Sequence, residues 1–125
     1  MSTKKSILIV DDSSVVRAAV RALLKPHLEF EVLAEAVNGQ DAVNMAERLE
    51  PDLIILDLSM PVMNGLEAAA LLIKMLPEVR IVLFTAHDGP EVERQAKMAG
   101  IHAVVSKNHG SPTLVTQAKA LTAEQ

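Results

Sequence analysis

The chain has 125 residues, 50% of them hydrophobic, which suits one globular domain with its own core, so we predict a single domain over residues 1–125. Its 12 Lys and Arg against 16 Asp and Glu give a net charge of -4, so we expect no direct binding of nucleic acid by this domain. The absence of cysteine excludes disulfides and thiolate metal sites and is compatible with a reducing cytoplasm, where we expect the protein to be.

The N-terminal residues do not have the pattern of a targeting or membrane segment. Two lysines precede an apolar run, but that run covers only residues 7–10 and is followed by two aspartates. A membrane-spanning helix needs about 20 apolar residues, and a signal peptide also needs a longer apolar region. We therefore expect no association with a membrane and interpret the run as a strand.

Short apolar runs alternate along the chain with longer stretches in which apolar residues recur every three or four positions. This alternation is typical of strand–helix units that build a parallel sheet covered by helices. The first run is continuously apolar, as expected for a strand that is buried on both faces. Strands are predicted over residues 7–10, 30–36, 53–56, 80–86 and 102–107.

Five helices are predicted between and after these strands, and serine, asparagine, proline and glycine mark their ends. The first helix begins at Ser13 or Ser14, and Asn38 is a candidate N-cap of the second. Pro90 lies near the first turn of the fourth helix, and Gly100 follows its last turn. The predicted helices cover residues 13–24, 39–49, 66–75, 88–100 and the stretch from 111 toward the C-terminal end.

Polar side chains stand where four of the five predicted strands end. Asp11 and Asp12 follow the first strand, and Asp57 follows the third. Thr85 lies at the end of the fourth strand and Lys107 at the end of the fifth. In an open parallel sheet, ligands bind at the carboxyl ends of the strands, where the strand order reverses. We therefore expect these five side chains to share one edge of the sheet.

The charges of these residues indicate a chemistry. Three crowded carboxylates repel one another, which raises their proton affinity unless a cation is bound, and hard oxygen ligands of this kind suit Mg2+ or Mn2+. A carboxylate that faces a phosphoryl donor can attack it, while a metal, a lysine and a hydroxyl stabilise the phosphoryl oxygens. The sequence therefore predicts that Asp57 forms an aspartyl phosphate. Taken alone, the Asp11–Asp12 pair could equally cap the first helix.

Four segments together resemble the receiver domain of two-component response regulators, namely ILIVDDSSVVR, DLIILDLSMPVMNGLEA, IVLFTA and VVSK. The resemblance covers essentially the whole chain. It implies a CheY-like, flavodoxin-like α/β fold, which is a three-layer (βα)5 doubly wound parallel sheet with strand order 2-1-3-4-5. The segment DLSMPVMNGLEA and the tripeptide SKN, which lacks proline, resemble receivers of the LuxR/NarL/FixJ type that are fused to helix-turn-helix DNA-binding domains.

The resemblance assigns a role to each residue of the predicted site. Asp57 matches the phosphoacceptor, and Thr85 and Lys107 match the switch hydroxyl and the phosphoryl-binding lysine. The Mg2+ ligands implied by the resemblance are Asp11, Asp12, Asp57 and the backbone carbonyl of Ser59.

The family resemblance also implies partners. A histidine kinase or phosphotransfer protein donates the phosphoryl group, and the domain catalyses only its own phosphorylation and dephosphorylation. The face formed by the fourth helix, fifth strand and fifth helix then changes and acts on an output domain or partner protein, and a homodimer through this face is a family-based expectation. The sequence leaves open whether the chain is a free-standing receiver or part of a DNA-binding regulator.

Four positions differ from the family pattern or adjust it. Val104 stands where an aromatic switch residue is common, so we expect another signalling route. Asn108 follows Lys107 in place of a cis-proline, and because a non-proline cis bond costs about 3–4 kcal/mol, we expect a trans peptide and a different loop over residues 108–112. Ser59 and His87 flank the path of the attacking water in this family and are predicted to tune the lifetime of the phosphate.

Three other functions share parts of this sequence pattern. A phosphatase similar to haloacid dehalogenases would need an aspartate two positions after the nucleophile, where Ser59 stands. A flavodoxin-like electron carrier has little support, because the chain has no Trp or Tyr and no phosphate loop after the first strand. A pseudo-receiver that binds partners without being phosphorylated is opposed by the complete acidic site, although Val104 and Asn108 leave it open.

Overall fold

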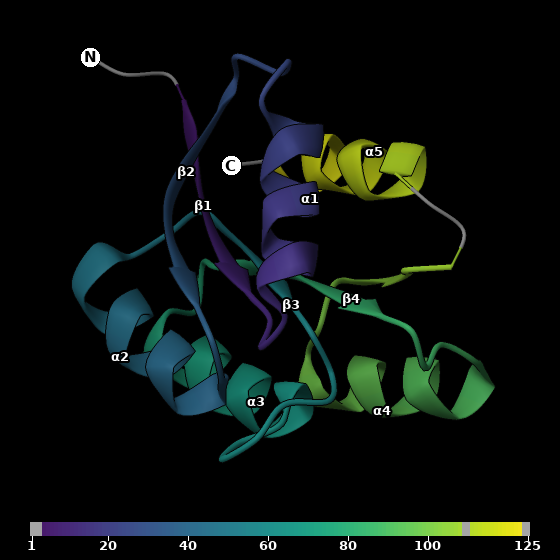
Figure 1. Cartoon of the computed structure of the whole chain (residues 1–125). Helices are drawn as coiled ribbons and strands as arrows, with labels where there is room; N and C mark the ends of the chain where they lie inside the picture. The colour runs from purple at the N-terminus through teal and green to yellow at the C-terminus, as the bar shows by residue number, and fades with distance from the viewer. Residues whose placement is uncertain (1–3, 109–110, 124–125) are drawn as a thin grey trace.

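The computed structural model describes residues 4–108 and 111–123, which form a five-stranded parallel sheet with helices on both faces (Figure 1). The strand order is β2-β1-β3-β4-β5, which confirms the predicted doubly wound topology. The strands are β1 Lys5–Val10, β2 Phe30–Ala36, β3 Leu53–Leu56, β4 Arg80–Thr85 and β5 Ala103–Ser106. The helices are α1 Ser14–Leu24, α2 Gly39–Leu49, α3 Gly65–Met75, α4 Pro90–Ala99 and α5 Ser111–Thr122.

The sheet separates two hydrophobic clusters. Successive residues of a strand point to opposite faces, so Ile7 and Ile9 of β1 pack under α1 and α5, whereas Leu8 and Val10 pack under α2, α3 and α4. Figure 1 shows the same division, with α1 and α5 on one side of the sheet and the other three helices on the opposite side. Burial on both faces explains why the central strands are continuously apolar in sequence.

Helix ends follow the local signals that the sequence contains. The Ser13 and Asn38 side chains accept hydrogen bonds from the first turns of α1 and α2, and Asn64 forms a capping box with Glu67 at the start of α3. Gly100 ends α4 in the left-handed conformation with φ 89°, as predicted for a C-terminal glycine.

Several predicted boundaries were wrong by one or two residues. β1 begins at Lys5, because Lys5 pairs with Phe30 and its N–H donates to the Glu29 carbonyl oxygen at 2.7 Å. The apolar pattern could not reveal this pairing, since it depends on a strand that is distant in sequence. β4 ends at Thr85, one residue earlier than predicted, and β5 covers four residues in place of the six expected. Within the described residues, no helix has both the length and the apolar character that crossing a membrane requires.

Candidate functional site

Asp11, Asp12 and Asp57 come together at the carboxyl edge of the sheet. β1 and β3 are neighbours, and the Asp57 N–H continues their pairing by donating to the Val10 carbonyl oxygen at 2.9 Å. One carboxylate oxygen from each aspartate lies within 4.8 Å of the other two. Asp11 and Asp57 are buried, with 3% and 6% of their surface exposed, whereas Asp12 is exposed. The cluster therefore opens to solvent on the side of Asp12.

Lys107 brings a positive charge into this cluster. Its Nζ lies 2.7 Å from Asp11 Oδ2 and 3.1 Å from Asp57 Oδ1, and it lies 5.9 Å from the centre of the Phe84 ring. The backbone positions Lys107 because its N–H donates to the Thr85 carbonyl oxygen at the end of β4, at 2.9 Å. A lysine from the fifth strand thus contacts acids from the first and third strands.

The electrostatics of Asp57 and Lys107 reflect their burial. Burial raises the pKa of the Asp57 carboxyl, the Asp11 carboxylate raises it further, and Lys107 only partly offsets these effects. Burial alone would lower the pKa of Lys107, but its hydrogen bond to Asp11 and the charge of Asp57 outweigh this, so its pKa lies above the usual range. The site therefore combines the charged ammonium of Lys107 with the Asp57 carboxyl, whose ionised form a further cation would stabilise.

The three carboxylates fit a divalent cation such as Mg2+ or Mn2+. Both ions prefer oxygen ligands, and Mg2+ retains several waters, which the exposed side at Asp12 accommodates. A site of oxygens alone, without histidine or cysteine, argues against zinc. Ser59, whose carbonyl was predicted as a further ligand, is exposed on the loop between β3 and α3, two residues beyond Asp57.

This β3–α3 loop packs tightly against Asp57. The Gly65 N–H donates to the Leu58 carbonyl oxygen at 2.8 Å, and a Cβ atom on Gly65 would lie only 2.2 Å from the Asp57 carbonyl oxygen. Glycine is therefore required here by the close approach of two backbone segments. Val62, at the outer end of the loop, is 81% exposed and has a φ of 70°, which is rare for a β-branched residue.

Thr85 is fully buried at the end of β4, and its Oγ1 accepts a hydrogen bond from the His87 N–H at 3.0 Å. The His87 side chain is exposed. In the described part of the chain, no hydrogen bond joins Thr85, His87 or Ser59 to the three carboxylates. The structure thus brings the aspartates and Lys107 into one cluster and leaves these three residues around it.

The two unusual positions near Lys107 have defined surroundings. The peptide bond before Asn108 is trans, as predicted, and the Asn108 side chain donates to the Ala86 carbonyl oxygen at 3.4 Å. His109 and Gly110 of the predicted loop lie outside the described residues. Val104 is partly buried against α4 and lines a shallow pocket of about 310 Å3 with residues of α4 and the α4–β5 turn.

Sequence reasoning missed three contacts, two of them at the site and the third at the opposite edge of the sheet, where β4 and β5 begin. The Arg17 side chain donates to the Asp11 carbonyl oxygen, the Leu58 N–H donates to Asp57 Oδ1, and the Ile81 N–H donates to His102 Nδ1. The position of Arg17 on α1 gave no signal of this contact, because a charged residue on an exposed helix face is usually solvated.

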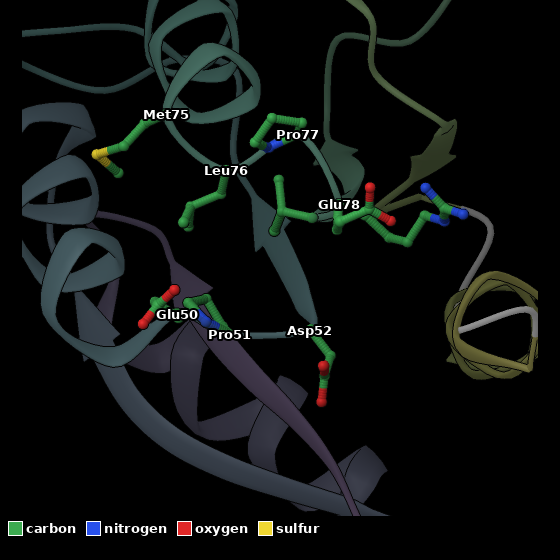
Figure 2. Close-up of a pocket in the computed structure, with 9 residues that line it drawn as sticks. Glu50, Pro51, Asp52, Met75, Leu76, Pro77 and Glu78 are labelled. Atoms are coloured by element: carbon green, nitrogen blue, oxygen red, sulfur yellow. The ribbon is translucent and has the colours of Figure 1, made fainter.

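A pocket away from the aspartates lies at the opposite edge of the sheet (Figure 2). It measures about 510 Å3 and is lined by residues 50–52 and 75–80. In Figure 2, Met75 and Leu76 face Glu50 and Pro51 across it, and the Asp52 side chain points away from them. Asp52 accepts hydrogen bonds from the Ser6 backbone and hydroxyl, which is a structural role. The carboxylate cluster is therefore defined by its chemistry and not by the size of its cavity.

Comparison with known proteins agrees with this geometry. The family model described as "Response regulator receiver domain" matches residues 7–119. The chain is 35% identical over 109 residues, or 87% of its length, to the transcriptional regulatory protein LnrK of Bacillus subtilis, of which it covers 50%. It is 51% identical over 65 residues, or 52% of its length, to a protein-glutamate methylesterase/protein-glutamine glutaminase of Paramagnetospirillum magneticum, of which it covers 18%.

Solved structures show the same likeness. A LuxR-family two-component response regulator from Aurantimonas sp. SI85-9A1 superimposes with a TM-score of 0.92 at 30% identity, over 98% of this chain and 87% of that chain. The chain spans about half the length, or less, of the curated relatives it matches.

Proposed function

This chain belongs to the response regulator receiver domain family of two-component signalling, and from that premise we propose that Asp57 accepts the phosphoryl group, with Mg2+ held by Asp11, Asp12, Asp57 and the Ser59 carbonyl. The observation that carries the proposal is the cluster of three carboxylates within 4.8 Å, two of them in contact with Lys107. The phosphatase and electron-carrier alternatives are not favoured, because the family match extends over residues 7–119.

The hydrogen bonds of Asp57 indicate which oxygen reacts. Oδ1 accepts from Lys107 Nζ and from the Leu58 N–H, whereas Oδ2 receives no hydrogen bond from the described residues. We assign Oδ2 as the nucleophile. It forms a bond to phosphorus while the bond from phosphorus to the donor's nitrogen or oxygen breaks, and the donor keeps that electron pair. When bound, Mg2+ would neutralise charge on the transferring phosphoryl oxygens.

Other residues of the chain orient the reaction. Lys107 donates to Oδ1 and would pair with the phosphoryl oxygens after transfer. Thr85 Oγ1 already accepts from the His87 N–H, so the Thr85 hydroxyl proton is available to donate to a phosphoryl oxygen. A movement of Thr85 toward that oxygen would be the switch. Ser59 and His87 are exposed beside the site, where their size and polarity would set the access of water and thus the lifetime of the phosphate.

The proposed partners follow from this chemistry. A histidine kinase or phosphotransfer protein donates the group, and the face formed by α4, β5 and α5 acts on an output domain, on a partner protein or on a second copy of the chain. Val104 on this face cannot rotate as an aromatic ring would, so we propose that repacking against α4 transmits the signal. In this proposal the domain works in the cytoplasm, acts on no separate substrate and binds no nucleic acid itself.

The proposal is tested by intact mass after incubation with acetyl phosphate and Mg2+. The wild-type chain should gain one phosphoryl group, and Asp57→Asn and a chelator should each abolish the gain. Asp88→Asn, at an exposed aspartate after β4, is the matched control and should be phosphorylated like the wild type. A folded wild-type chain that gains no mass, or Asp57→Asn that still does, would overturn the assignment. In the first case the pseudo-receiver alternative would stand.

A further inference from the structure

Arg17 on α1 reaches the turn that carries the two adjacent aspartates. Its Nη1 donates to the Asp11 carbonyl oxygen at 2.7 Å, and its Nε donates to Glu35 Oε1 at 2.9 Å. The side chain is only 15% exposed. We propose that Arg17, held by Glu35, is a positioning residue that sets the geometry of the Asp11–Asp12 turn for Mg2+ binding. The inference rests on the proposed function of this site.

The contact acts on the peptide that joins the two aspartates. The Asp11 carbonyl belongs to the planar peptide unit that continues into Asp12, so fixing this oxygen fixes the direction in which Asp12 leaves the turn. The Asp11 carboxylate has its own anchors, because Oδ1 accepts from the Ser13 N–H and Oδ2 accepts from Lys107. Asp12 is exposed, and its place in the cluster therefore depends on the backbone that Arg17 holds.

Glu35 makes the placement of Arg17 rigid. It lies on β2 opposite Ile9 of β1, just before the aspartate turn, so its carboxylate is tied to the same sheet. Hydrogen bonds from Arg21 and Arg17 hold the pKa of Glu35 below its usual range, which keeps the carboxylate ionised. A guanidinium that bonds a carboxylate with one nitrogen and a carbonyl with another has its orientation set by both.

Arg21 provides a matched comparison on the same helix. One turn after Arg17, it donates to the other oxygen of Glu35 at 2.8 Å, with 47% of its side chain exposed. In the described part of the chain it makes no hydrogen bond to the aspartate turn. Loss of either arginine removes an ion pair with Glu35, but only loss of Arg17 removes the contact with Asp11.

The test compares Arg17→Met, Arg17→Lys and Arg21→Met in the full chain. Each is titrated with Mg2+ while thermal stability is recorded, and the Mg2+ concentration that half-saturates phosphorylation by acetyl phosphate is measured separately. Arg17→Met should raise about 10-fold both the Mg2+ concentration that half-saturates the thermal stabilisation and the one that half-saturates phosphorylation. Residues that hold a metal ligand in place commonly change metal affinity by this factor when they are replaced. Arg21→Met should stay within about 2-fold of the wild type. Arg17→Lys, which keeps the charge but reaches only one of the two partners, should lie between them.

The two measurements separate this inference from the proposed function. If the wild type takes up no phosphoryl group, the proposed function fails, and the stability titration still decides the role of Arg17. An unchanged Mg2+ requirement in Arg17→Met would overturn the inference, as would an equal increase in Arg21→Met, since a shared effect would mean a general loss of helix stability. If Arg17→Met does not fold, the Mg2+ requirement of Arg17→Lys is compared with that of Arg21→Met. A larger requirement in Arg17→Lys supports the inference, and an equal one overturns it.

Discussion

The ammonium of Lys107 lies 2.7 Å from the carboxylate of Asp11, although 96 positions separate the two residues in the chain. Both side chains are largely withdrawn from water, with 19% of Lys107 and 4% of Asp11 exposed. A buried carboxylate that loses its partner is left uncompensated, which costs more than the loss of an exposed pair. Loss of Lys107 should therefore destabilise the metal-free fold, and in the proposed function its ammonium would also pair with anionic phosphoryl oxygens.

Replacing Lys107 with Met should have three effects, on the metal-free stability, on the stabilisation by Mg2+ and on the phosphorylation rate. Without Mg2+, unfolding free energy should fall by roughly 2 kcal/mol, because Asp11 and Asp57 then repel each other without a cation between them. The stabilisation by added Mg2+ should grow, since the ion no longer competes with the ammonium for the carboxylates. Phosphorylation by acetyl phosphate should slow about 100-fold, as expected for loss of a charged group at the reacting oxygens.

Lys119→Met is the control for Lys107→Met, because Lys119 is an exposed lysine of α5 that lies 3.8 Å from Glu29. Its unfolding free energy should stay within about 0.5 kcal/mol of the wild type. A Lys107→Met chain with unchanged stability and an unchanged phosphorylation rate would show that the ammonium is dispensable.

Removing Asp12, a proposed metal ligand, should separate Mg2+ binding from folding. Asp12 is exposed, so Asp12→Asn should change the metal-free unfolding free energy by no more than about 0.5 kcal/mol. Wild-type protein should gain about 2.7 kcal/mol at a Mg2+ concentration 100 times the dissociation constant, and Asp12→Asn should gain much less at that concentration. Urea denaturation with Mg2+ and with chelator measures both values. Equal Mg2+ stabilisation of the two chains would remove Asp12 from the ligand set.

The His102 side chain predicts a pH dependence of stability. Its Nδ1 accepts from the Ile81 N–H at 3.0 Å, and burial, together with the charge of Arg80, lowers its pKa from the ordinary 6.5. The unfolded chain therefore takes up the proton first. The stabilisation should be fully present above pH 6.5, decline as the pH falls from there, and be lost below the lowered pKa of the folded state.

Two variants at His102 check this prediction by urea denaturation between pH 5 and 8. His102→Asn places an amide oxygen where Nδ1 accepts, so it should keep the stability seen at high pH and lose this part of the pH dependence. His102→Ala should be less stable by about 1 kcal/mol at high pH, because the Ile81 N–H loses its acceptor. An unaltered pH profile in both variants would mean that another group titrates.

Gly65→Ala should damage the site through the backbone. The added Cβ would lie 2.2 Å from the Asp57 carbonyl oxygen and 3.0 Å from the Leu58 Cα, and neither backbone atom can move without shifting the loop. We expect a loss of about 2–4 kcal/mol in unfolding free energy and slower phosphorylation of Asp57. Ala70→Ser, on the exposed face of the same helix, should have little effect on either measurement. A stable and fully active Gly65→Ala chain would show that the loop adapts.

The elements and their order could be predicted from local pattern alone. Buried parallel strands need continuous apolar runs, amphipathic helices need their own period, and Pro, Gly and Asn mark the ends, so each signal lies within a few neighbouring residues. Asp57 at the end of such a run was recognisable for the same reason. The start of β1, which depends on pairing with β2, was misplaced, as were the end of β4, both ends of β5, the start of α3 and both ends of α4, each by one or two residues.

The contacts that make the site were decided by the tertiary structure. The sequence by itself placed acids, a hydroxyl and a lysine at strand ends, and the parallel topology brought them to one edge. It did not show that Lys107 lies nearer to Asp11 than to Asp57, that Arg17 holds the Asp11 carbonyl, or that Gly65 touches the Asp57 backbone. Such contacts depend on strand order and on the reach of side chains across the sheet, and neither leaves a periodic trace along the chain.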